Sequence, residues 1–224
     1  MRAWVAGVEV ELLAARALLW PAESALLVAD LHVGKPEAFQ RRGVPVPSTA
    51  GEADLARLSA TLDATGARSL WVLGDLVHGA EAAATDGLAR LRRRHPRVSL
   101  HVVRGNHDRH VERLPEAWGF EEHLAPATLG PFALCHEPPA AAWPAGAAAG
   151  TGGYALAGHL HPMVRLRGGG DELVLPCFQF RDRVGLLPAF TAWSSGVRVT
   201  PREGRTFAVT GAEVVAVPGP ALSP

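Results

Sequence analysis

The sequence predicts an α/β fold with a layered core, followed by a β-rich C-terminal part. Short apolar runs with the length of buried strands recur along the chain. Helical patterns lie between the early runs, as in crossover units that join strands of one sheet. From about residue 162 onward, short strand patterns alternate with Gly and Pro turns and no good helix is found. We expect this last part to be largely antiparallel.

The individual elements follow from the same patterns. A helix is expected to begin at Thr49, with Glu52 as the partner in a capping box and with Leu55, Leu58 and Leu62 on one face. A second helix is expected over residues 81–94. Early strands are expected at residues 25–29, 70–73, 98–103, 132–135 and 154–157. Later strands are expected at residues 172–175, 186–191, 206–210 and 213–217.

Length and composition indicate an ordinary globular protein. The 224 residues suit one domain, expected over residues 1–217, with a flexible tail rich in Pro and Gly at residues 218–224. A hydrophobic content of 48% argues against disorder. The 22 basic residues balance the 22 acidic ones, so net charge gives no general attraction to nucleic acid.

Cysteine content and the N-terminal residues predict a cytoplasmic protein. Cys135 and Cys177 are too few for a disulfide framework, and they do not form a CxxC pair. Glu9 and Glu11 interrupt the apolar run that a secretory signal needs. The uncharged stretch 138–158 contains Pro and Gly residues that would break a helix, so we expect a loop and no membrane association.

Polar residues that can bind metals follow each of the five early apolar runs. Strands of one sheet deliver such residues to the same edge, where open α/β sheets usually place their sites. We therefore expect one site built from five strand ends. Its candidate ligands are Asp30, His32, Asp75, Asn106, His136, His159 and His161.

The residue types indicate the kind of metal. Imidazoles and carboxylates without thiolates suit Mn, Fe or Zn, of which Mn is our first choice. The pairs Asp30-x-His32 and His159-x-His161 suit a strand end, because alternate residues point to the same side. Seven ligands exceed the need of one ion, and Asp75 can bridge two ions with its two oxygens. The sequence therefore predicts two divalent metal ions.

A site for two divalent ions predicts phosphoester hydrolysis. A pair of ions about 3.5–4 Å apart activates a bridging water, orients a phosphoryl group and neutralises charge on the attacking and leaving oxygens. His107 lies beside Asn106 but outside the ligand set, so we expect it to protonate the leaving oxygen. Asp108 is expected to hydrogen-bond that imidazole and hold its orientation.

The order of these motifs resembles a known family. DxH, GDxx(D or H), GNH(D or E), a lone His and GHxH follow one another over residues 30–161, which is similar to the signature of the calcineurin-like metallophosphoesterases. The resemblance implies a four-layer αββα sandwich of two mixed β-sheets flanked by helices. It also implies one ion on Asp30, His32, Asp75 and His161, and the other on Asp75, Asn106, His136 and His159.

Flanking residues resemble one branch of this family more closely, the bacterial ligase-associated DNA damage response endonucleases. They lie at residues 19–21, 29–35, 42–47, 136–138 and 175–178. The resemblance implies DNA as substrate, a role in DNA repair, and an ATP-dependent DNA ligase and helicase-like proteins as partners. His78 replaces the Asp or Arg of many phosphatases and is similar to the double-strand-break repair nucleases, which also favours DNA.

Two other functions stay open. One is a phosphodiesterase or phosphatase for small molecules such as cyclic nucleotides. The other is a non-catalytic scaffold, which would be marked by lost ligands, whereas none is lost here.

The remaining charged residues divide into substrate candidates and residues without an assigned role. Arg41 and Arg42, between the first motif and a Pro-rich turn, are expected to contact a substrate phosphate, as is Arg104 before the third motif. Cys135 should face away from the side of His136 and be a buried, inert thiol. Histidines without a motif context are expected to be surface or core residues, and these are His95, His101, His110 and His123.

Overall fold

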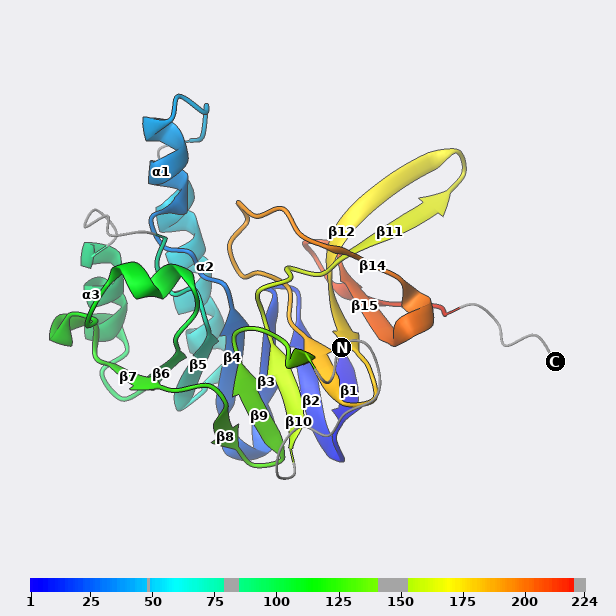
Figure 1. Ribbon diagram of the computed structural model, residues 1–224, viewed down its shortest axis with the longest axis horizontal. Coiled ribbons are helices and arrows are strands. Elements are labelled where there is room, and N and C mark those ends of the chain that lie inside the picture. The colour runs from blue at the N-terminus through cyan, green and yellow to red at the C-terminus, as the bar shows by residue number, and fades with distance from the viewer. Residues whose placement is uncertain (48, 79–84, 141–152, 220–224) are drawn as a thin grey trace.

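The computed structural model describes residues 1–47, 49–78, 85–140 and 153–219 (Figure 1). Its first sheet runs in the order β1-β2-β3-β4-β5-β6-β7. The pairs from β1 to β4 are antiparallel and those from β4 to β7 are parallel. The strands are β1 (Arg2–Val5), β2 (Val8–Leu13), β3 (Ala17–Trp20), β4 (Ala25–Ala29), β5 (Ser69–Leu73), β6 (Ser99–Val103) and β7 (Phe120–His123).

The second sheet runs in the order β14-β11-β12-β13-β10-β9-β8, with β15 paired to β12 and β16 paired to β15. Its C-terminal strands are mostly antiparallel as expected, but β13 is parallel to β10 and β14 is parallel to β11. The two mixed sheets confirm the predicted fold class. The strands are β8 (Ala127–Leu129), β9 (Phe132–Cys135), β10 (Tyr154–Ala157), β11 (Met163–Gly168), β12 (Asp171–Phe180), β13 (Val184–Leu186), β14 (Arg198–Val199), β15 (Arg205–Val209) and β16 (Val214–Val217).

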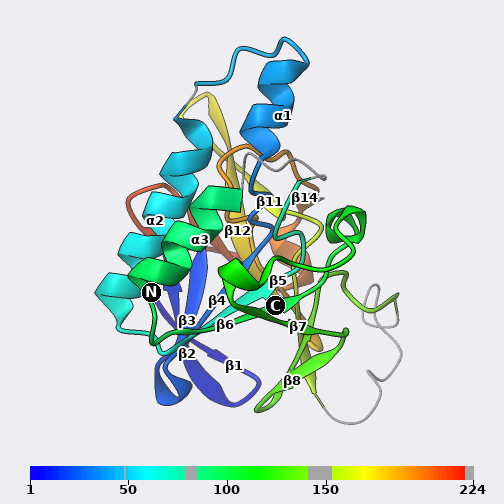
Figure 2. The ribbon, with the colours of Figure 1, turned by 90° about the vertical axis from the view of Figure 1, so that its left-hand side faces the viewer.

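The α-helices join the parallel strands of the first sheet. They are α1 (Lys35–Arg41), α2 (Ala50–Thr65) and α3 (Thr85–Arg94), and α2 and α3 cover one face of that sheet (Figure 2). Leu58 and Leu88 are fully buried there, in a cluster with strand side chains. Thr49 precedes α2 but makes no side-chain capping bond, so the predicted capping box is wrong.

A second layer of α-helices, implied by the family resemblance, is not found among the described residues. After α3 the described helical segments are short 3₁₀ turns. They are η3 (His107–His110), η4 (Glu116–Trp118) and η6 (Pro201–Glu203), and a further one, η1 (Pro21–Glu23), precedes β4.

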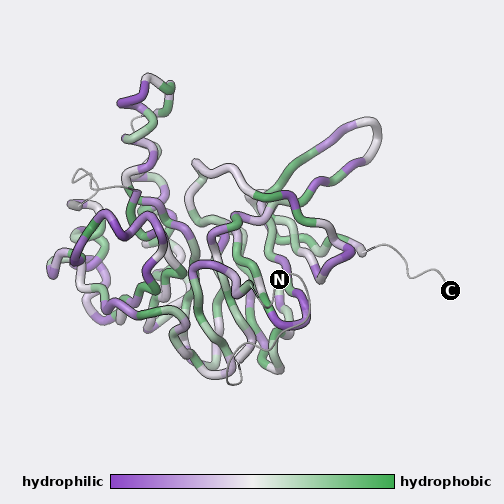
Figure 3. The backbone as a smooth tube through the Cα atoms, viewed as in Figure 1, coloured by the Kyte–Doolittle hydropathy of each residue, from purple (hydrophilic) through white to green (hydrophobic). Residues whose placement is uncertain are grey.

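The main hydrophobic core lies between the two sheets. Leu27 from the first sheet and Leu156 and Phe178 from the second are fully buried in one cluster. Trp20 and Phe132 meet edge to face across the interface with ring centroids 5.3 Å apart. Figure 3 shows the hydrophobic residues along the strands and a mostly hydrophilic segment after β6. Because each buried large side chain contributes about 1.5–3 kcal/mol, this core holds the two sheets face to face.

The segment at residues 186–191 differs from the expected strand. Strand β13 ends at Leu186, and the chain then crosses from one sheet to the other. The Leu187 N–H donates to the Ala157 carbonyl at the end of β10 (2.8 Å), and the Phe190 N–H donates to the Ala29 carbonyl at the end of β4 (2.7 Å). This crossing fixes the ends of β4 and β10 beside each other.

Some sequence-based expectations concern residues outside the described part of the chain. They include most of the loop predicted at 138–153, the first turn of the helix predicted at 81–94, and residues 220–224 of the predicted tail. None of the described helices is both long enough and apolar enough to cross a membrane. Helix α1 and the β11–β12 hairpin project from the same side of the molecule (Figure 1).

Candidate metal centre

The structure brings all seven predicted ligand residues to one place, at the carboxyl ends of parallel strands. Residues after β4, β5 and β6 meet residues after β9 and β10 of the facing sheet. The first cluster consists of the Asp30 carboxylate and the imidazoles of His32 and His161. In it, the Nε2 of His161 lies 3.6 Å from the Oδ1 of Asp30. His32 completes this cluster and places its Nε2 3.7 Å from the Oδ2 of Asp75.

A second cluster surrounds the Nε2 of His136. This nitrogen lies 2.8 Å from the Asn106 Oδ1 and 3.0 Å from the His159 Nδ1. The Asp75 Oδ2 is 3.5 Å away from it. Asp75 therefore lies between the two clusters, and the His136 Nδ1 also lies 3.6 Å from the Asp30 Oδ1 of the first cluster. The division into two ligand sets that the family resemblance implies stays a prediction.

Several buried atoms of the centre have no hydrogen-bond partner among the described residues. These are the Oδ1 of Asp30, both ring nitrogens of His32 and the Nε2 of His161. An unsatisfied buried polar group costs about 1–3 kcal/mol, so such a concentration requires an explanation. Bound divalent cations would satisfy the lone pairs of the Asp30 Oδ1, of the His161 Nε2 and of one His32 nitrogen, and the residues present fit them.

The electrostatics of the site also favour cations. Burial, reinforced by Lys35, strongly lowers the pKa of His32 and keeps its imidazole in the neutral form that binds metals. Burial raises the pKa of Asp75, although His136 opposes this shift. The raised pKa of Asp75 means that its buried carboxylate lacks a stabilising positive charge, which a bound divalent ion would supply.

An unusual backbone conformation aims most of the candidate ligands. Five of the seven have a positive φ, between 46° and 65°, and they are Asp30, His32, Asp75, His159 and His161. Each such residue costs about 1–3 kcal/mol and persists where the surroundings enforce it. The two residues of each pair do converge as expected, but the reason given for it, the alternation of side chains along a strand, is wrong. The strands end at Ala29 and Ala157, and left-handed turns beyond them bring the pairs together.

Each central carboxylate uses one oxygen as an anchor and presents the other to the centre. The Asp30 Oδ2 accepts the His159 N–H and the Asp75 Oδ1 accepts the His107 N–H, both at 2.9 Å. Gly158 permits the first contact, because a Cβ on it would lie 2.4 Å from the Asp30 Oδ2. The glycine of the GHxH motif is thus explained by packing against a carboxylate of the facing sheet.

A backbone carbonyl selects the tautomer of one imidazole. The His161 Nδ1–H donates to the Ser195 carbonyl (2.8 Å). A proton on Nδ1 leaves the His161 Nε2 lone pair directed at the centre. This imidazole of the second sheet is therefore oriented before any ion binds.

Sequence reasoning missed the group that holds residues 191 and 192, in the segment that leads to Ser195. Asp54 on α2 is 6% exposed and accepts the Thr191 hydroxyl (2.7 Å), the Ala192 N–H (3.3 Å) and the Arg57 guanidinium (2.8 Å). Arg57 also donates to a carbonyl of the same segment. A signal was present, because Asp54 lies on the buried stripe of α2 that includes Leu58.

His107 lies at the edge of the centre, as a general acid would. Its half-buried ring has its centroid 5.2 Å from the His32 ring and 4.9 Å from the His78 ring. Burial, followed by the charge of His107, lowers the pKa of His78 to about 4. His78 is therefore neutral beside His107 over the physiological range.

The role expected for Asp108 is wrong. Its two carboxylate oxygens accept the N–H groups of Val77 (3.0 Å) and Gly105 (2.8 Å), and it is fully buried. No hydrogen bond to the His107 ring is found among the described residues. Asp108 instead ties the turn after β6 to the turn after β5, which positions the backbone around Asp75.

The predicted phosphate contacts have different outcomes. Arg104 is not available to a substrate, because it donates to the carbonyls of Asp108 and Val111 and pairs with Glu122 at 3.1 Å. Arg41 and Arg42 are exposed at the end of α1, and the charge of Arg42 reaches His78. Their contact with a substrate phosphate stays a prediction.

Lys35 is a further cation that sequence reasoning did not select. It is the first residue of α1 and is half-buried. Burial lowers its pKa, while Asp30 and Asp75 raise it, which places its ammonium group within electrostatic reach of both carboxylates. Its position directly after the first motif was the available signal.

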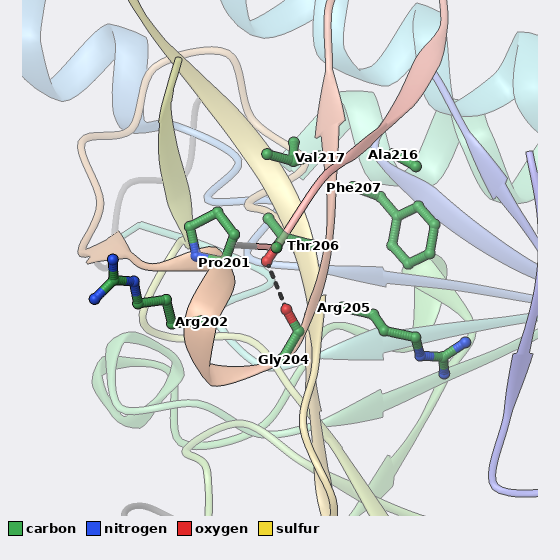
Figure 4. A pocket seen from close by; sticks show the side chains of 9 residues that line it. Pro201, Arg202, Gly204, Arg205, Thr206, Phe207, Ala216 and Val217 are labelled. Carbon is green, nitrogen blue, oxygen red and sulfur yellow. Dashed lines mark hydrogen bonds between the residues drawn. The ribbon is translucent and has the colours of Figure 1, made fainter. Parts of the chain in front are cut away.

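Two surface hollows differ in their relation to the centre. One, of about 330 Å³, is lined by Asn106, His136 and Arg109 among others, so it opens beside the second cluster. The other, of about 380 Å³, lies along β15 and β16 (Figure 4), where the Thr206 hydroxyl donates to the Gly204 carbonyl (3.1 Å). Its lining contains no candidate ligand, so it is not part of this site.

Comparisons with known proteins agree with this geometry. The family model of the calcineurin-like phosphoesterases matches residues 24–175, which include all seven candidate ligands. The crystal structure of the Pseudomonas putida nuclease MPE is similar to this chain, with a TM-score of 0.81 and 35% sequence identity. The match covers 97% of this chain and 99% of the nuclease. No curated protein matches the chain.

Proposed function

Because this chain belongs to the calcineurin-like phosphoesterase family, we propose that it is a nuclease that hydrolyses phosphodiester bonds of DNA. The observation that carries the proposal is the pair of His/Asp clusters with Asp75 between them, typical of a binuclear metallophosphoesterase. The likeness to a nuclease over nearly the full length supports nucleic acid as the substrate class. His78 and the flanking residues that resemble repair endonucleases support DNA.

The two clusters would hold two divalent cations, for which we propose Mn²⁺. One would bind to Asp30, His32, Asp75 and His161, and the other to Asp75, Asn106, His136 and His159. Bound cations of this kind supply an activated water and neutralise charge on the phosphate. The chain's own part is to fix the ligand atoms, through the anchored oxygens of the two carboxylates and the tautomer of His161.

His107 completes the site as the general acid. Its backbone N–H is anchored on Asp75, and its ring stands at the edge of the centre next to the neutral His78. From this place it can give a proton to the leaving oxygen of the nucleotide. Lys35, Arg41 and Arg42, at the two ends of α1, are suited to the phosphates of the DNA backbone.

We also propose a role in DNA repair, with an ATP-dependent DNA ligase and a helicase-like protein as partners. This part rests on the resemblance of the flanking residues alone. Co-purification of the tagged chain with a DNA ligase from its native host would support it, and recovery without such a ligase would count against it.

The test is metal-dependent hydrolysis by the wild type, Asp75→Asn and His107→Gln. Each protein is assayed in the presence of Mn²⁺ on four substrates, which are single-stranded DNA, a 2′,3′-cyclic nucleotide, a phosphomonoester and bis(p-nitrophenyl) phosphate. Loss of charge stabilisation worth several kcal/mol should slow Asp75→Asn by about 10³-fold or more on every substrate that the wild type cleaves. Loss of a general acid should slow His107→Gln by about 10²–10⁴-fold on DNA.

The aryl ester separates acid catalysis from structural damage. Its p-nitrophenolate leaves without a proton, so His107→Gln should retain most activity on it while bound metal stays unchanged. His110→Gln, an exposed histidine of the same 3₁₀ turn, is the matched control. An equal loss on both substrates would contradict the acid role. Turnover of cyclic nucleotides or monoesters alone would move the function to small molecules, and no turnover would favour the scaffold.

A further inference from the structure

We propose that His101, Glu121 and His123 form a separate binding site for one divalent transition-metal ion, with Zn²⁺ as the best match. His101 lies on β6 and the other two lie on the edge strand β7, where the register pairs His101 with Glu121. His123 follows Glu121 by two residues, so all three side chains stand on the same face of the sheet. The site shares no residue with the candidate metal centre, and sequence reasoning assigned these histidines no role.

The distances between the ligand atoms fit one small ion. The His101 Nδ1 lies 3.1 Å from the His123 Nε2 and 3.4 Å from the Glu121 Oε2. The His123 Nε2 lies 3.8 Å from the Glu121 Oε1. A tetrahedral Zn²⁺ with bonds of about 2.0–2.1 Å needs ligands about 3.3 Å apart. The two imidazole nitrogens and the Glu121 carboxylate therefore surround a position that an ion can occupy with little movement.

The chemistry of the three groups matches the same ion. Two imidazoles and one carboxylate are a ligand set that zinc uses when it keeps a fourth position for water. Burial, opposed by Glu121, lowers the pKa of His101 and favours the neutral imidazole that binds metals. The Glu121 side chain is 67% exposed, so the fourth position faces solvent.

Trp71 holds the two imidazoles in place. It is 8% exposed, and its ring stacks on His101 with centroids 4.2 Å apart and an interplanar angle of 15°. The His123 ring lies 4.9 Å from the same indole. Orienting the rings before binding lowers the entropy that an ion has to offset. The ion would join β7 to β6 and stabilise the edge of the first sheet.

The alternative is that the three side chains only hydrogen-bond to each other. In that arrangement one imidazole donates to the other, and the cluster needs no ion. The two possibilities differ in the number of ions bound per chain, which equilibrium dialysis against Zn²⁺ at low micromolar concentration measures. The difference between variants is decisive, because the candidate metal centre contributes equally to all of them.

We expect wild type to bind one Zn²⁺ per chain more than His123→Gln. His110→Gln, at an exposed histidine outside both sites, should bind as many ions as wild type. This difference of one ion is independent of the proposed hydrolysis and persists if the candidate metal centre stays empty. Equal content in wild type and His123→Gln would overturn the proposal.

A second variant guards against a folding defect in His123→Gln. Glu121→Gln changes a largely exposed side chain, so the metal-free protein should unfold at the wild-type temperature. Zn²⁺ should bind to its site at least about 10-fold more weakly and should raise its unfolding temperature less than that of wild type, by mass action. An unchanged affinity and an unchanged temperature shift would also overturn the proposal.

Discussion

The two sheets contribute to the candidate metal centre in different ways. On the first sheet, Asp30, His32 and Asp75 are at most 2% exposed, and the turns that carry them pair with each other through backbone bonds such as His32 N–H to Asp75 carbonyl (2.8 Å). On the second sheet, His161 is partly exposed and depends on the carbonyl of Ser195 in a long segment. One half is built into the strand crossovers, and the other is held by distant contacts.

The two halves of the metal centre should therefore respond differently to substitutions. Residues with positive φ occur in both halves, but in the first half backbone bonds between the turns and the anchored carboxylates fix the same positions. The second half can loosen while the fold persists, because its support runs from α2 through Asp54 to the segment of Ser195. Changes in the first half should therefore damage stability and activity together, whereas changes in the support of the second half should mainly weaken metal binding.

Gly158→Ala should give the largest effect, because Gly158 lies where the two halves meet. Its new Cβ would lie 2.4 Å from the Asp30 Oδ2 and 3.0 Å from the Leu73 carbonyl. Overpacking of this kind costs about 1–3 kcal/mol. Displacement of Asp30 by about 1 Å should slow hydrolysis by about 10²-fold. Urea unfolding and hydrolysis of the aryl diester measure the two effects.

Gly168→Ala is the control for this steric argument. A Cβ on Gly168 meets nothing within 4 Å, so stability and activity should stay close to those of wild type. If Gly158→Ala behaves like this control, the first half has more freedom than its contacts indicate.

Asp54→Asn should give a smaller effect of a different kind. The amide keeps the shape but loses the charge that holds Arg57 and the segment of residues 191–192. Loss of an interaction that positions a ligand typically costs about 10–100-fold in metal affinity or activity. Raising the metal concentration should restore the activity of Asp54→Asn, whereas it should not restore that of Gly158→Ala.

The matched control lies on the same helix. Asp63 pairs with Arg94, and both side chains are at least half exposed, so Asp63→Asn should leave stability close to that of wild type. An activity of Asp54→Asn that excess metal fails to restore would mean that Asp54 supports the fold rather than the metal half.

The outcome of the sequence predictions follows the same division. The five early strands and the convergence of their polar ends were predicted, because each strand is a continuous apolar run and parallel strands end at one edge. Three features were not predicted, because they depend on contacts between residues far apart in the chain. They are the left-handed turns, the hydrogen bonds of Asp54 to residues 191 and 192, and the crossing at residues 187–191. Asp108 and Arg104 were misassigned for a related reason, since a polar residue near a motif can serve the loop rather than the substrate.

Strands β1 and β2 show where local patterns are too weak. Their short runs mix apolar residues with charged ones such as Glu9 and Glu11, so no strand was expected there. No strand was expected at β3 either, although its four residues are all apolar. Pairing in sequence with the buried β4 makes them strands. The register of β6 and β7, which gathers His101, Glu121 and His123, is equally invisible in the sequence.

Cys135→Ala should give the smallest effect, although the residue is adjacent to His136. The Cys135 side chain packs in a cluster with Ala155 and Cys177 on the face of the second sheet away from the main core. Burial raises the thiol pKa of Cys135, and burial raises that of Cys177 to about 12. Both thiols should therefore stay protonated and unreactive toward a thiol reagent at pH 8 until the protein unfolds.

Thiol titration in buffer and in urea, with bound metal measured in parallel, tests this expectation. Cys135→Ala should keep hydrolysis within about twofold of wild type, because the thiol packs in a cluster that contains no candidate ligand. A thiol that reacts in the native protein and displaces metal would mean that the sulfur faces the centre. In that case the second half of the centre would also be accessible to solvent from the outer face of its sheet. The two halves would then differ more in accessibility than the contact of His161 with Ser195 alone indicates.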